Sequence, residues 1–205
     1  MTDDGVRDDG VMARLDSLVD RAFEPLRGQP QADRAAAGLS NLSDYGLIWV
    51  LLALIKARRA GPVRRRTVVA LGAAGFSSLA LSRVAKQAVE RQRPEAHLDA
   101  NVRTPSSSSF PSGHTLAAFT TAVVLPGTEA GTVAAVTFAA AVAASRVHLR
   151  AHHPTDVIGG AVMGSLLGLI LRPVVRLIAP GTATRRGGRR GVQGMENGGV
   201  WLERI

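Results

Sequence analysis

The chain has 205 residues and a formal net charge of +9, and 46% of its residues are hydrophobic but only 4% are aromatic. This length predicts one domain, and a sequence without cysteine excludes disulfides, zinc–thiolate sites and thiol nucleophiles. The charged residues concentrate in the first forty residues, in 58–66, in 83–103 and after Arg172, with apolar stretches between them. This distribution is typical of membrane helices joined by polar loops, so the positive charge indicates anionic lipid headgroups rather than nucleic acid.

The amino-terminal region predicts an amphipathic helix. Residues 1–10 are acidic and contain glycine, and we expect them to be disordered. Over 11–26, apolar residues recur at helical spacing with Asp and Arg between them, and Pro25 and Pro30 end the pattern. Such a helix lies on a membrane surface or against the helix bundle, and a small solvent-exposed cap helix is the alternative. The first forty residues lack the apolar core of a cleavable signal peptide, so membrane insertion must come from internal segments.

Five apolar segments follow, at 42–57, 67–84, 115–125, 132–147 and 157–171. The second helix is expected to continue through Lys86 to Gln92, and the fifth to extend to Ile178 past Pro173. The predicted fold is therefore an all-α integral membrane helical bundle with about five transmembrane helices and an amino-terminal amphipathic surface helix. We expect three parts, namely a tail and amphipathic helix (1–40), a membrane domain (41–179) and a disordered basic tail rich in Gly and Arg (180–205).

The basic segments predict the orientation in the membrane. Loops rich in Lys and Arg stay in the cytoplasm, which places 58–66 and 172–190 on that side. With five spans, the polar loops 93–112 and 148–155 then share the outer face, and the amino terminus lies outside as well. All the candidate catalytic residues border those two loops, so the sequence predicts a single site on the outer face of a bacterial cytoplasmic membrane.

Three short motifs carry the chemistry: Lys86-x6-Arg93-Pro94, Pro111-Ser112-Gly113-His114, and Ser145-Arg146-x5-His152-x3-Asp156. A phosphate ester resists attack because its oxygens repel nucleophiles, so catalysis needs cations, a positioned nucleophile and an acid for the leaving oxygen. Lys86, Arg93 and Arg146 supply the cations, Lys as a point charge and Arg as a planar fork. Pro94 should end the second helix, with Lys86 about two turns back on the same helix face as Arg93.

The second motif predicts an anion site at the amino terminus of a helix. Ser112 is a candidate N-cap, and the backbone N–H groups around Gly113 then point outward. Glycine lets a phosphate approach the backbone closely, and His114 projects at the rim of the site.

The third motif supplies a nucleophile and its partner. His152 and Asp156 precede the fifth span, with Pro154 suited to the first helical turn. In that arrangement the carboxylate approaches one ring nitrogen of His152, fixes its tautomer and leaves the other nitrogen free to attack phosphorus. His114 then protonates the leaving oxygen and later activates water. Because the cations neutralise the phosphate, the pattern requires no metal and no cofactor.

These motifs resemble those of the type 2 phosphatidic acid phosphatases, a family that includes bacterial acid phosphatases and vanadium haloperoxidases. The family pattern K-x6-R-P, P-S-G-H, S-R-x5-H-x3-D is matched at every fixed position, and the resemblance covers roughly residues 67–171. It implies that His152 is the nucleophile, Asp156 its partner and His114 the acid–base. It also implies a phosphate-binding set made of Lys86, Arg93, Ser112, Gly113 and Arg146. Membrane members usually have six spans, so we expect the amphipathic helix to replace the first.

The resemblance implies a lipid phosphatase. Its candidate substrates are a polyprenyl phosphate, a polyprenyl diphosphate or a polyprenyl-linked sugar phosphate, with phosphatidic acid and phosphatidylglycerol phosphate as alternatives. The Ala- and Arg-rich composition is typical of a GC-rich bacterial genome and favours a polyprenyl substrate. The apolar spans disfavour a vanadate-dependent peroxidase, and the intact His114, His152 and Asp156 disfavour a non-catalytic lipid-binding protein.

The other polar residues near the motifs are interpreted as loop residues. His148 and His153 lie outside the pattern, and His97 is expected in a solvated loop. The serines 106–109 are expected to form a flexible linker, with part of a mobile rim over the site as the alternative. A metal site built from His148, His152 and His153 is disfavoured because no carboxylate cluster accompanies them.

Overall fold

The computed structural model describes residues 5–43, 61–94, 107–125 and 128–179. Each element in these ranges is a helix, which confirms the all-α prediction. In chain order the elements are α1 (Gly5–Phe23), the 3-10 helix η1 (Glu24–Leu26), α2 (Pro30–Ser43), α4 (Pro62–Ala88), α5 (Gly113–Val124), α6 (Glu129–His148) and α7 (Pro154–Ile178).

Three of the described helices, α4, α6 and α7, are long and apolar enough to cross a membrane. They correspond to the predicted second, fourth and fifth spans, and α7 continues to Ile178 through Pro173 as expected. The predicted third span is α5, whose 12 residues extend only ~18 Å, short of the ~30 Å hydrocarbon layer. The predicted first span lies outside the described residues except for 42–43, which end α2. The prediction of an integral membrane helical bundle is confirmed.

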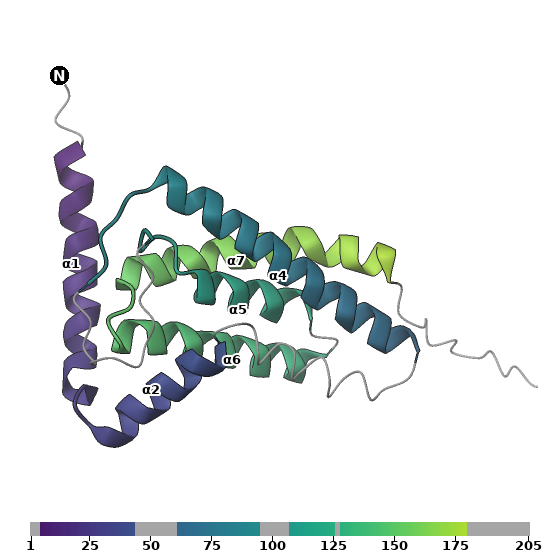
Figure 1. Cartoon of the computed structure of the whole chain (residues 1–205), viewed down its shortest axis with the longest axis horizontal. Helices are drawn as coiled ribbons and strands as arrows, with labels where there is room; N and C mark the ends of the chain where they lie inside the picture. The colour runs from purple at the N-terminus through teal and green to yellow at the C-terminus, as the bar shows by residue number, and fades with distance from the viewer. Residues whose placement is uncertain (1–4, 44–60, 95–106, 126–127, 180–205) are drawn as a thin grey trace, which may run out of the picture.

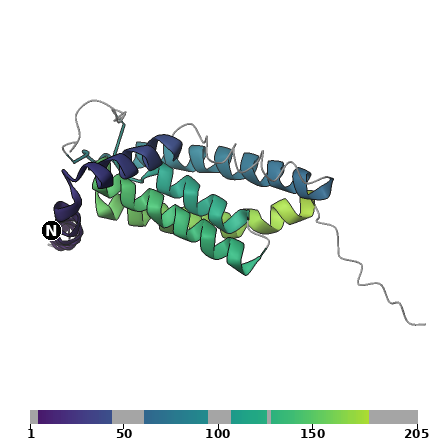
Figure 2. The ribbon, with the colours of Figure 1, turned by 90° about the horizontal axis from the view of Figure 1, so that it is seen from below.

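The central helix of the bundle is α5. It lies alongside α4, α6 and α7, and the two perpendicular views in Figure 1 and Figure 2 show these helices running in roughly the same direction. Its side chains Leu116 and Ala122 are fully buried. The outward faces of α4 and α7 instead expose large apolar side chains, among them Phe76, Ile170 and Leu177. Such extensive apolar exposure is expected where the surrounding solvent is lipid.

α7 approaches α5 closely because its contact face carries glycine. Gly160, Gly164 and Gly168 recur at four-residue spacing on one face of α7. A Cβ at Gly160 would lie 2.7 Å from the carbonyl oxygen of Ser112, and a Cβ at Gly164 would overlap the carbonyl of Leu116. Side chains at these positions would push the two helices apart. The glycines therefore set the distance between the helix that follows the second motif and the helix that begins in the third.

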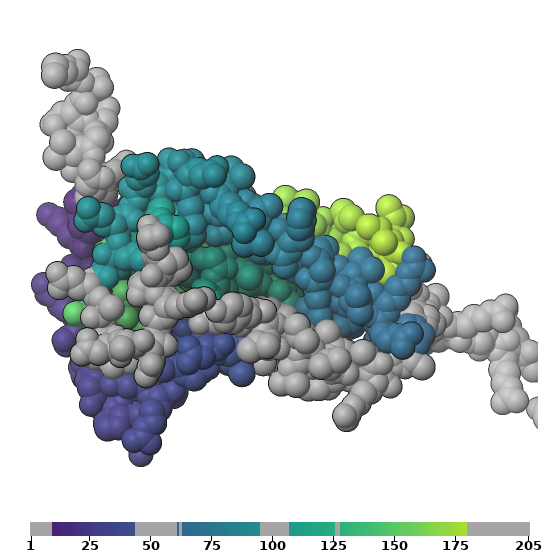
Figure 3. Space-filling view, in the orientation of Figure 1, coloured from purple at the N-terminus to yellow at the C-terminus, as the bar shows by residue number. Residues whose placement is uncertain are grey.

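The amino-terminal helices cover the end of the bundle at which α5 and α7 begin. α1 crosses this end at a steep angle to the bundle, while α2 packs along α6 (Figure 1). In the space-filling view of Figure 3, α4 covers one face of the molecule and the amino-terminal helices form the edge below its left end. α1 begins at Gly5, so the predicted disorder of 1–10 is wrong for the part that the structure describes.

α1 turns both polar and apolar side chains toward the bundle. Asp16 is buried, and Val19 and Phe23 pack against buried residues of α6 and α7. The large apolar side chains exposed on α1 are Val11, Met12, Leu15 and Leu18, and the polar residues Arg14, Ser17 and Arg21 are exposed as well. The helix thus lies against the bundle, one of the predicted positions, and its exposed stripe has the composition of a helix that rests on a membrane surface.

α4 ends at Ala88, so the prediction that this helix reaches Gln92 is wrong. The following residues leave the helix because their carbonyl oxygens bond to the segment before α5. The Val89 carbonyl accepts from Oγ of Ser108 at 2.6 Å, and the Arg91 carbonyl accepts the Ser109 N–H at 2.9 Å. The first and last residues of the first motif therefore do not share a helix face.

Replacing Gly164 with Ala should destabilise the protein, because the added Cβ meets the backbone of Leu116. Overpacking of this kind costs ~1–3 kcal/mol. Gly72→Ala on α4 is the matched control, because a Cβ there meets nothing within 4 Å and helix propensity favours Ala by up to ~1 kcal/mol. Thermal unfolding in detergent should show a lower midpoint temperature for Gly164→Ala but not for Gly72→Ala. An unchanged midpoint would contradict the close approach of α5 and α7.

Candidate active site

The candidate residues gather around the segment 107–112, which leads into α5. Besides its bonds to Val89 and Arg91, this segment accepts the Arg91 N–H through Oγ of Ser108 at 3.3 Å. At its other end, the Ser112 N–H donates to the Asp156 carbonyl at 3.1 Å. The segment is thus tied to the end of α4 and to the start of α7. The prediction of a flexible linker is therefore wrong for the serines at 107–109.

Backbone carbonyls of this segment hold the two cations of the first motif. Nζ of Lys86 donates to the Ser108 carbonyl at 2.5 Å. Arg93 donates to the Ser107 carbonyl through Nε at 3.2 Å and to the Ser108 carbonyl through Nη2 at 3.3 Å. Nη1 of Arg93 donates to the Ala151 carbonyl at 2.8 Å. Lys86 and Arg93 therefore meet at one carbonyl, although they are not on one helix.

The same segment selects the tautomer of His152. Nδ1 of His152 lies 2.7 Å from the Ser109 carbonyl oxygen. A carbonyl only accepts, so this contact requires the proton on Nδ1 and leaves a lone pair on Nε2. Nε2 lies 3.3 Å from Nη1 of Arg93, which can only donate. The geometry gives the tautomer that a nucleophilic histidine needs and points its lone pair at a predicted phosphate ligand.

His152 is buried, and its pKa lies well below the usual value for histidine. Burial is the largest cause, and the positive charges of Arg93, Arg146 and Lys86 lower the pKa further. The hydrogen bond to the Ser109 carbonyl opposes these effects. The ring is therefore neutral at neutral pH, and its lone pair is not lost to a proton.

Asp156 does not fix His152 as predicted. Its Oδ2 lies 3.9 Å from Nδ1 of His152, beyond hydrogen-bond distance, because that nitrogen is directed to the Ser109 carbonyl. Oδ2 instead accepts the backbone N–H of His153 at 2.9 Å, which is the cap geometry expected at the start of α7. Oδ1 accepts from Nη1 of Arg91 at 2.5 Å. The Ser109 carbonyl, not the carboxylate, sets the tautomer.

Arg91 joins Asp156 to α1. Its Nη1 also donates to Oγ1 of Thr155 at 2.8 Å, and its Nη2 donates to Oδ2 of Asp16 at 2.6 Å. Asp16 in turn accepts the backbone N–H of Thr155 at 2.8 Å. Burial lowers the pKa of Arg91, but the hydrogen bonds and charges of Asp16 and Asp156 outweigh it and raise that pKa. The first turn of α7 is thus held between the first motif and α1. Sequence reasoning missed Arg91 because it occupies a variable position of the motif.

The second motif lies at the same end of the bundle. Ser112 is the N-cap residue of α5, as predicted, but it is fully buried and its side chain makes no capping bond. Gly113 lies against α4, where a Cβ would stand 3.1 Å from Oγ of Ser82. His114 follows in the first turn of α5 and is half-buried. Since Ser112 bonds to Asp156, the second motif lies beside the end of the third motif.

Arg146 is buried near the carboxyl end of α6 and donates to Oγ of Ser40 on α2. Its backbone carbonyl accepts the N–H groups of Ala151 at 3.0 Å and of His152 at 3.3 Å. Arg146 therefore supports the turn that carries His152, and its charge acts on the histidine ring. The contact with Ser40 shows that α2 lines the interior beside the site, which the sequence did not predict.

Further contacts tie the amino-terminal segment to the end of α6. His148 is the buried last residue of α6, and its Nε2 lies 2.7 Å from Oδ1 of Asp33, so the predicted loop position is wrong. Arg27 donates to the carbonyls of Val147 and His148, both at 3.1 Å, where a cation suits the helix carboxyl end. Local pattern could not pair His148 with Asp33 or Arg27, because the partners are 115 and 121 positions apart.

The site is cationic around a neutral histidine. Among the described residues, no group of three or more His, Cys, Asp or Glu side chains is placed to hold a metal ion. Lys86, Arg93 and Arg146 instead bring positive charge to His152. Such an arrangement can neutralise phosphate oxygens and present a nucleophile to phosphorus.

The sequence matches a known family over more than half of its length. The model of the PAP2 superfamily matches residues 67–178. The decaprenylphosphoryl-5-phosphoribose phosphatase of Mycolicibacterium smegmatis is 40% identical over 137 residues, which cover 66% of this chain and 74% of that protein. The protein of the same name from Mycobacterium tuberculosis is 36% identical over 154 residues, which cover 75% of this chain and 81% of that protein.

Solved structures of membrane phosphatases share the fold. A transmembrane PAP2-type phosphatidylglycerolphosphate phosphatase from Bacillus subtilis superposes with a TM-score of 0.64 at 25% identity, covering 82% of this chain and 88% of that one. LpxE from Aquifex aeolicus superposes with a TM-score of 0.61 at 27% identity, covering 76% of this chain and 93% of that one. Sequence and structure therefore lead to the same group of proteins.

Replacing Arg91 with Gln should lower kcat for phosphate-ester hydrolysis and leave KM nearly unchanged, because Arg91 positions Asp156 and the start of α7. We expect a loss between about tenfold and about a hundredfold, as for other small misplacements of reacting groups. Arg91→Lys should restore part of kcat by keeping one charged donor. Arg21→Gln, which removes an exposed charge from α1, is the matched control. A rise in KM without loss of kcat would instead place Arg91 on the substrate.

Proposed function

The chain belongs to the PAP2 superfamily and is a membrane lipid phosphatase, and we propose that it removes the terminal phosphate from a polyprenyl-linked sugar phosphate. The observation that carries the mechanism is the neutral, buried His152 whose Nε2 faces Arg93. The substrate class is supported by the two mycobacterial relatives, whose names specify decaprenylphosphoryl-5-phosphoribose. Phosphatidylglycerol phosphate is the second candidate, because the Bacillus neighbour is named for it.

Substrate binding exchanges the partners of the cations. Without substrate, Lys86 and Arg93 donate to backbone carbonyls, and Nη1 of Arg93 also faces Nε2 of His152. A phosphate oxygen that takes this Nη1 donor frees the histidine lone pair for attack. Arg146, near the carboxyl end of α6, adds positive charge beside the turn that carries His152. The backbone N–H groups of the first turn of α5, from Gly113 onward, complete the anion site.

In the first step, Nε2 of His152 attacks phosphorus, and the bond from phosphorus to the ester oxygen breaks as the N–P bond forms. His114 donates a proton to the departing oxygen, so the dephosphorylated lipid leaves as an alcohol. The ring of His152 gains positive charge in the phosphohistidine. Its Nδ1–H remains bonded to the Ser109 carbonyl, which favours that charge.

In the second step, His114 takes a proton from water, and the water oxygen attacks phosphorus as the N–P bond breaks. Inorganic phosphate leaves, His152 regains its lone pair, and His114 is protonated again. Asp156 contributes by holding the first turn of α7 and by keeping Arg91 in place.

We place the site on the outer face of a bacterial cytoplasmic membrane. The motifs gather at one end of the bundle, whereas the exposed Arg64 and Arg65, in the first turn of α4, lie at the other end (Figure 1). Because basic segments stay in the cytoplasm, the catalytic end then faces outward. In this arrangement 41–179 form the phosphatase domain, the described part of 1–40 covers its catalytic end, and 180–205 are a basic tail.

A covalent intermediate should be trapped on His152. Purified protein that is mixed with a radiolabelled polyprenyl-linked ribose phosphate and quenched in base should carry an acid-labile label, and His152→Ala should lose both label and turnover. His114→Asn should slow turnover of this lipid by about 10²- to 10⁴-fold. With p-nitrophenyl phosphate, whose leaving group needs no proton, the same variant should accumulate label, because only the second step then needs His114. EDTA should leave turnover unchanged.

Full turnover by His152→Ala would refute the assigned nucleophile. Loss of activity on chelation that added metal restores would contradict a mechanism that relies on side-chain cations alone.

The orientation can be tested by labelling, because the natural sequence contains no cysteine. Arg21→Cys lies on the exposed surface of α1 at the catalytic end, and Arg65→Cys lies at the opposite end. A membrane-impermeant maleimide added to intact cells, or to spheroplasts of a host with an outer membrane, should label Arg21→Cys and leave Arg65→Cys unlabelled until the membrane is opened. The reverse pattern would place the site in the cytoplasm.

A further inference from the structure

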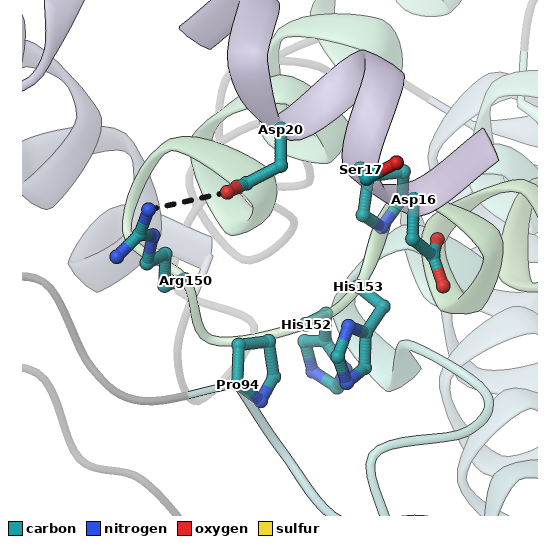
Figure 4. Close-up of a pocket in the computed structure, with 8 residues that line it drawn as sticks. Asp16, Ser17, Asp20, Pro94, Arg150, His152 and His153 are labelled. Atoms are coloured by element: carbon teal, nitrogen blue, oxygen red, sulfur yellow. Dashed lines mark hydrogen bonds and ion pairs between the residues drawn. The ribbon is translucent and has the colours of Figure 1, made fainter. Parts of the chain in front are cut away.

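A cavity of about 310 Å³ opens between α1 and the turn that precedes α7, beside the proposed nucleophile. Figure 4 shows side chains of α1 on one side of this hollow and side chains of the turn facing them. Its polar lining residues are Asp16, Ser17, Asp20, Arg150, His152 and His153. The volume falls at the lower end of the ~300–1,000 Å³ typical of small-molecule sites. The cavity therefore has room for a group larger than the phosphate itself.

The α1 side of the cavity carries two carboxylates, those of Asp16 and Asp20. Burial raises the pKa of Asp20, but the hydrogen bonds and charges of Arg27 and Arg150 outweigh it and lower that pKa below its usual value. Asp16 pairs with Arg91 at 2.6 Å. An ionised carboxylate only accepts hydrogen bonds and offers about four lone-pair positions. Asp20 accepts from Arg27 and Arg150, so it keeps capacity for an O–H donor.

The other lining groups suit a ligand that both donates and accepts. Oγ of Ser17 donates to the Arg14 carbonyl at 2.9 Å and keeps its lone pairs for a further donor. Nη2 of Arg150 bonds to Asp20 at 3.2 Å and to Glu24 at 3.1 Å. A guanidinium has five N–H donors, so Arg150 can also donate to a hydroxyl oxygen. Neighbouring hydroxyl groups on a sugar ring match this mixture, whereas an acyl chain does not.

A second anionic group of the substrate would be favoured outside the cavity at α1. A larger hollow of about 1190 Å³ extends from the last turns of α4 to the segment 107–108, and its charged lining residues are Glu90 and the cations Arg83, Lys86, Arg91 and Arg93. Arg83 precedes Lys86 by about one helical turn, so positive charge continues from the phosphate site along α4. A phosphodiester that links a sugar to a lipid fits this cationic side. The acidic cavity is left for an uncharged polar group.

We propose that the cavity at α1 is a sugar subsite, in which Asp20, Ser17 and Arg150 bind the hydroxyl groups of the sugar that carries the phosphate. The proposal rests on the proposed function, because the phosphate must lie at His152 for its sugar to reach the cavity. None of the three motifs includes a residue of α1. Substrate choice is therefore separated from chemistry: the motifs cleave the ester, and α1 selects what the phosphate is attached to.

The test compares two lipids that differ in the sugar. Ser17→Phe places an aromatic ring in the cavity from an exposed position of α1. It should lower kcat/KM for a polyprenyl-linked ribose phosphate at least about tenfold more than kcat/KM for polyprenyl phosphate, which carries no sugar. Asp20→Asn, which keeps the side-chain volume, should also lower kcat/KM more for the sugar-bearing lipid than for polyprenyl phosphate, and so lower the ratio of the two kcat/KM values. Ala13→Phe adds the same bulk to an exposed position of α1 that does not line the cavity, and should leave the ratio unchanged.

A binding measurement makes the test independent of turnover. Calorimetry on the full-length protein in detergent should show that ribose 5-phosphate binds at least about tenfold more tightly than inorganic phosphate. Ser17→Phe should remove this advantage. Equal losses of kcat/KM for the two lipids, or equal affinities for ribose 5-phosphate and inorganic phosphate, would overturn the proposed subsite. If the natural protein hydrolyses neither lipid, the proposed function fails, and the calorimetry still decides the subsite. If Ser17→Phe does not fold, Asp20→Asn and the natural protein decide it.

Discussion

The catalytic end of this protein depends on three consecutive backbone carbonyls, those of Ser107, Ser108 and Ser109. They accept hydrogen bonds from Arg93, Lys86 and His152, so one short segment without regular structure sets the positions of two cations and a neutral imidazole. Carbonyls suit this task because they are fixed by the chain and carry no net charge. Carboxylates in the same places would hold the cations equally well, but they would cancel the positive charge that an incoming phosphate needs.

The segment stays in place because its ends are tied to long helices. Ser108 bonds to the residues that follow α4, and Ser112 bonds to the start of α7. The distance between α5 and α7 is in turn set by the glycine contacts, of which Gly164 against Leu116 is the tightest. A change in helix spacing within the bilayer would therefore move the carbonyls, and through them the cations, at the membrane surface. The helices thus position the candidate residues that they carry themselves, such as Lys86 and His114, and also the connections that carry Arg93 and His152.

The apolar segments and the three motifs could be predicted from sequence because composition and spacing are local properties. The hydrogen-bond partner of His152 could not be predicted, because it is a backbone carbonyl, that of Ser109, and every residue type has one. A sequence motif shows only side chains, and among these Asp156 is the obvious candidate. The bond between Arg91 and Asp16 spans 75 positions and involves a side of α1 whose charges indicate a solvent-facing surface. In this protein Asp16 of α1 is instead buried against the bundle, while apolar residues such as Leu15 and Leu18 are exposed.

Asp16 and Asp20 of α1 lie beside the proposed phosphate site, where their negative charge would repel an anionic substrate. The structure offsets this repulsion by pairing: Asp16 bonds to Arg91, and Asp20 bonds to Arg27 and Arg150. Each pair cancels much of the local negative charge and leaves the positive charges of Arg93, Arg146 and Lys86 dominant at His152. The carboxylate lone pairs that remain can still accept hydrogen bonds from neutral hydroxyls, which no long-range repulsion keeps away. The arginines that attach α1 to the bundle therefore also make its acidic side compatible with an anionic substrate.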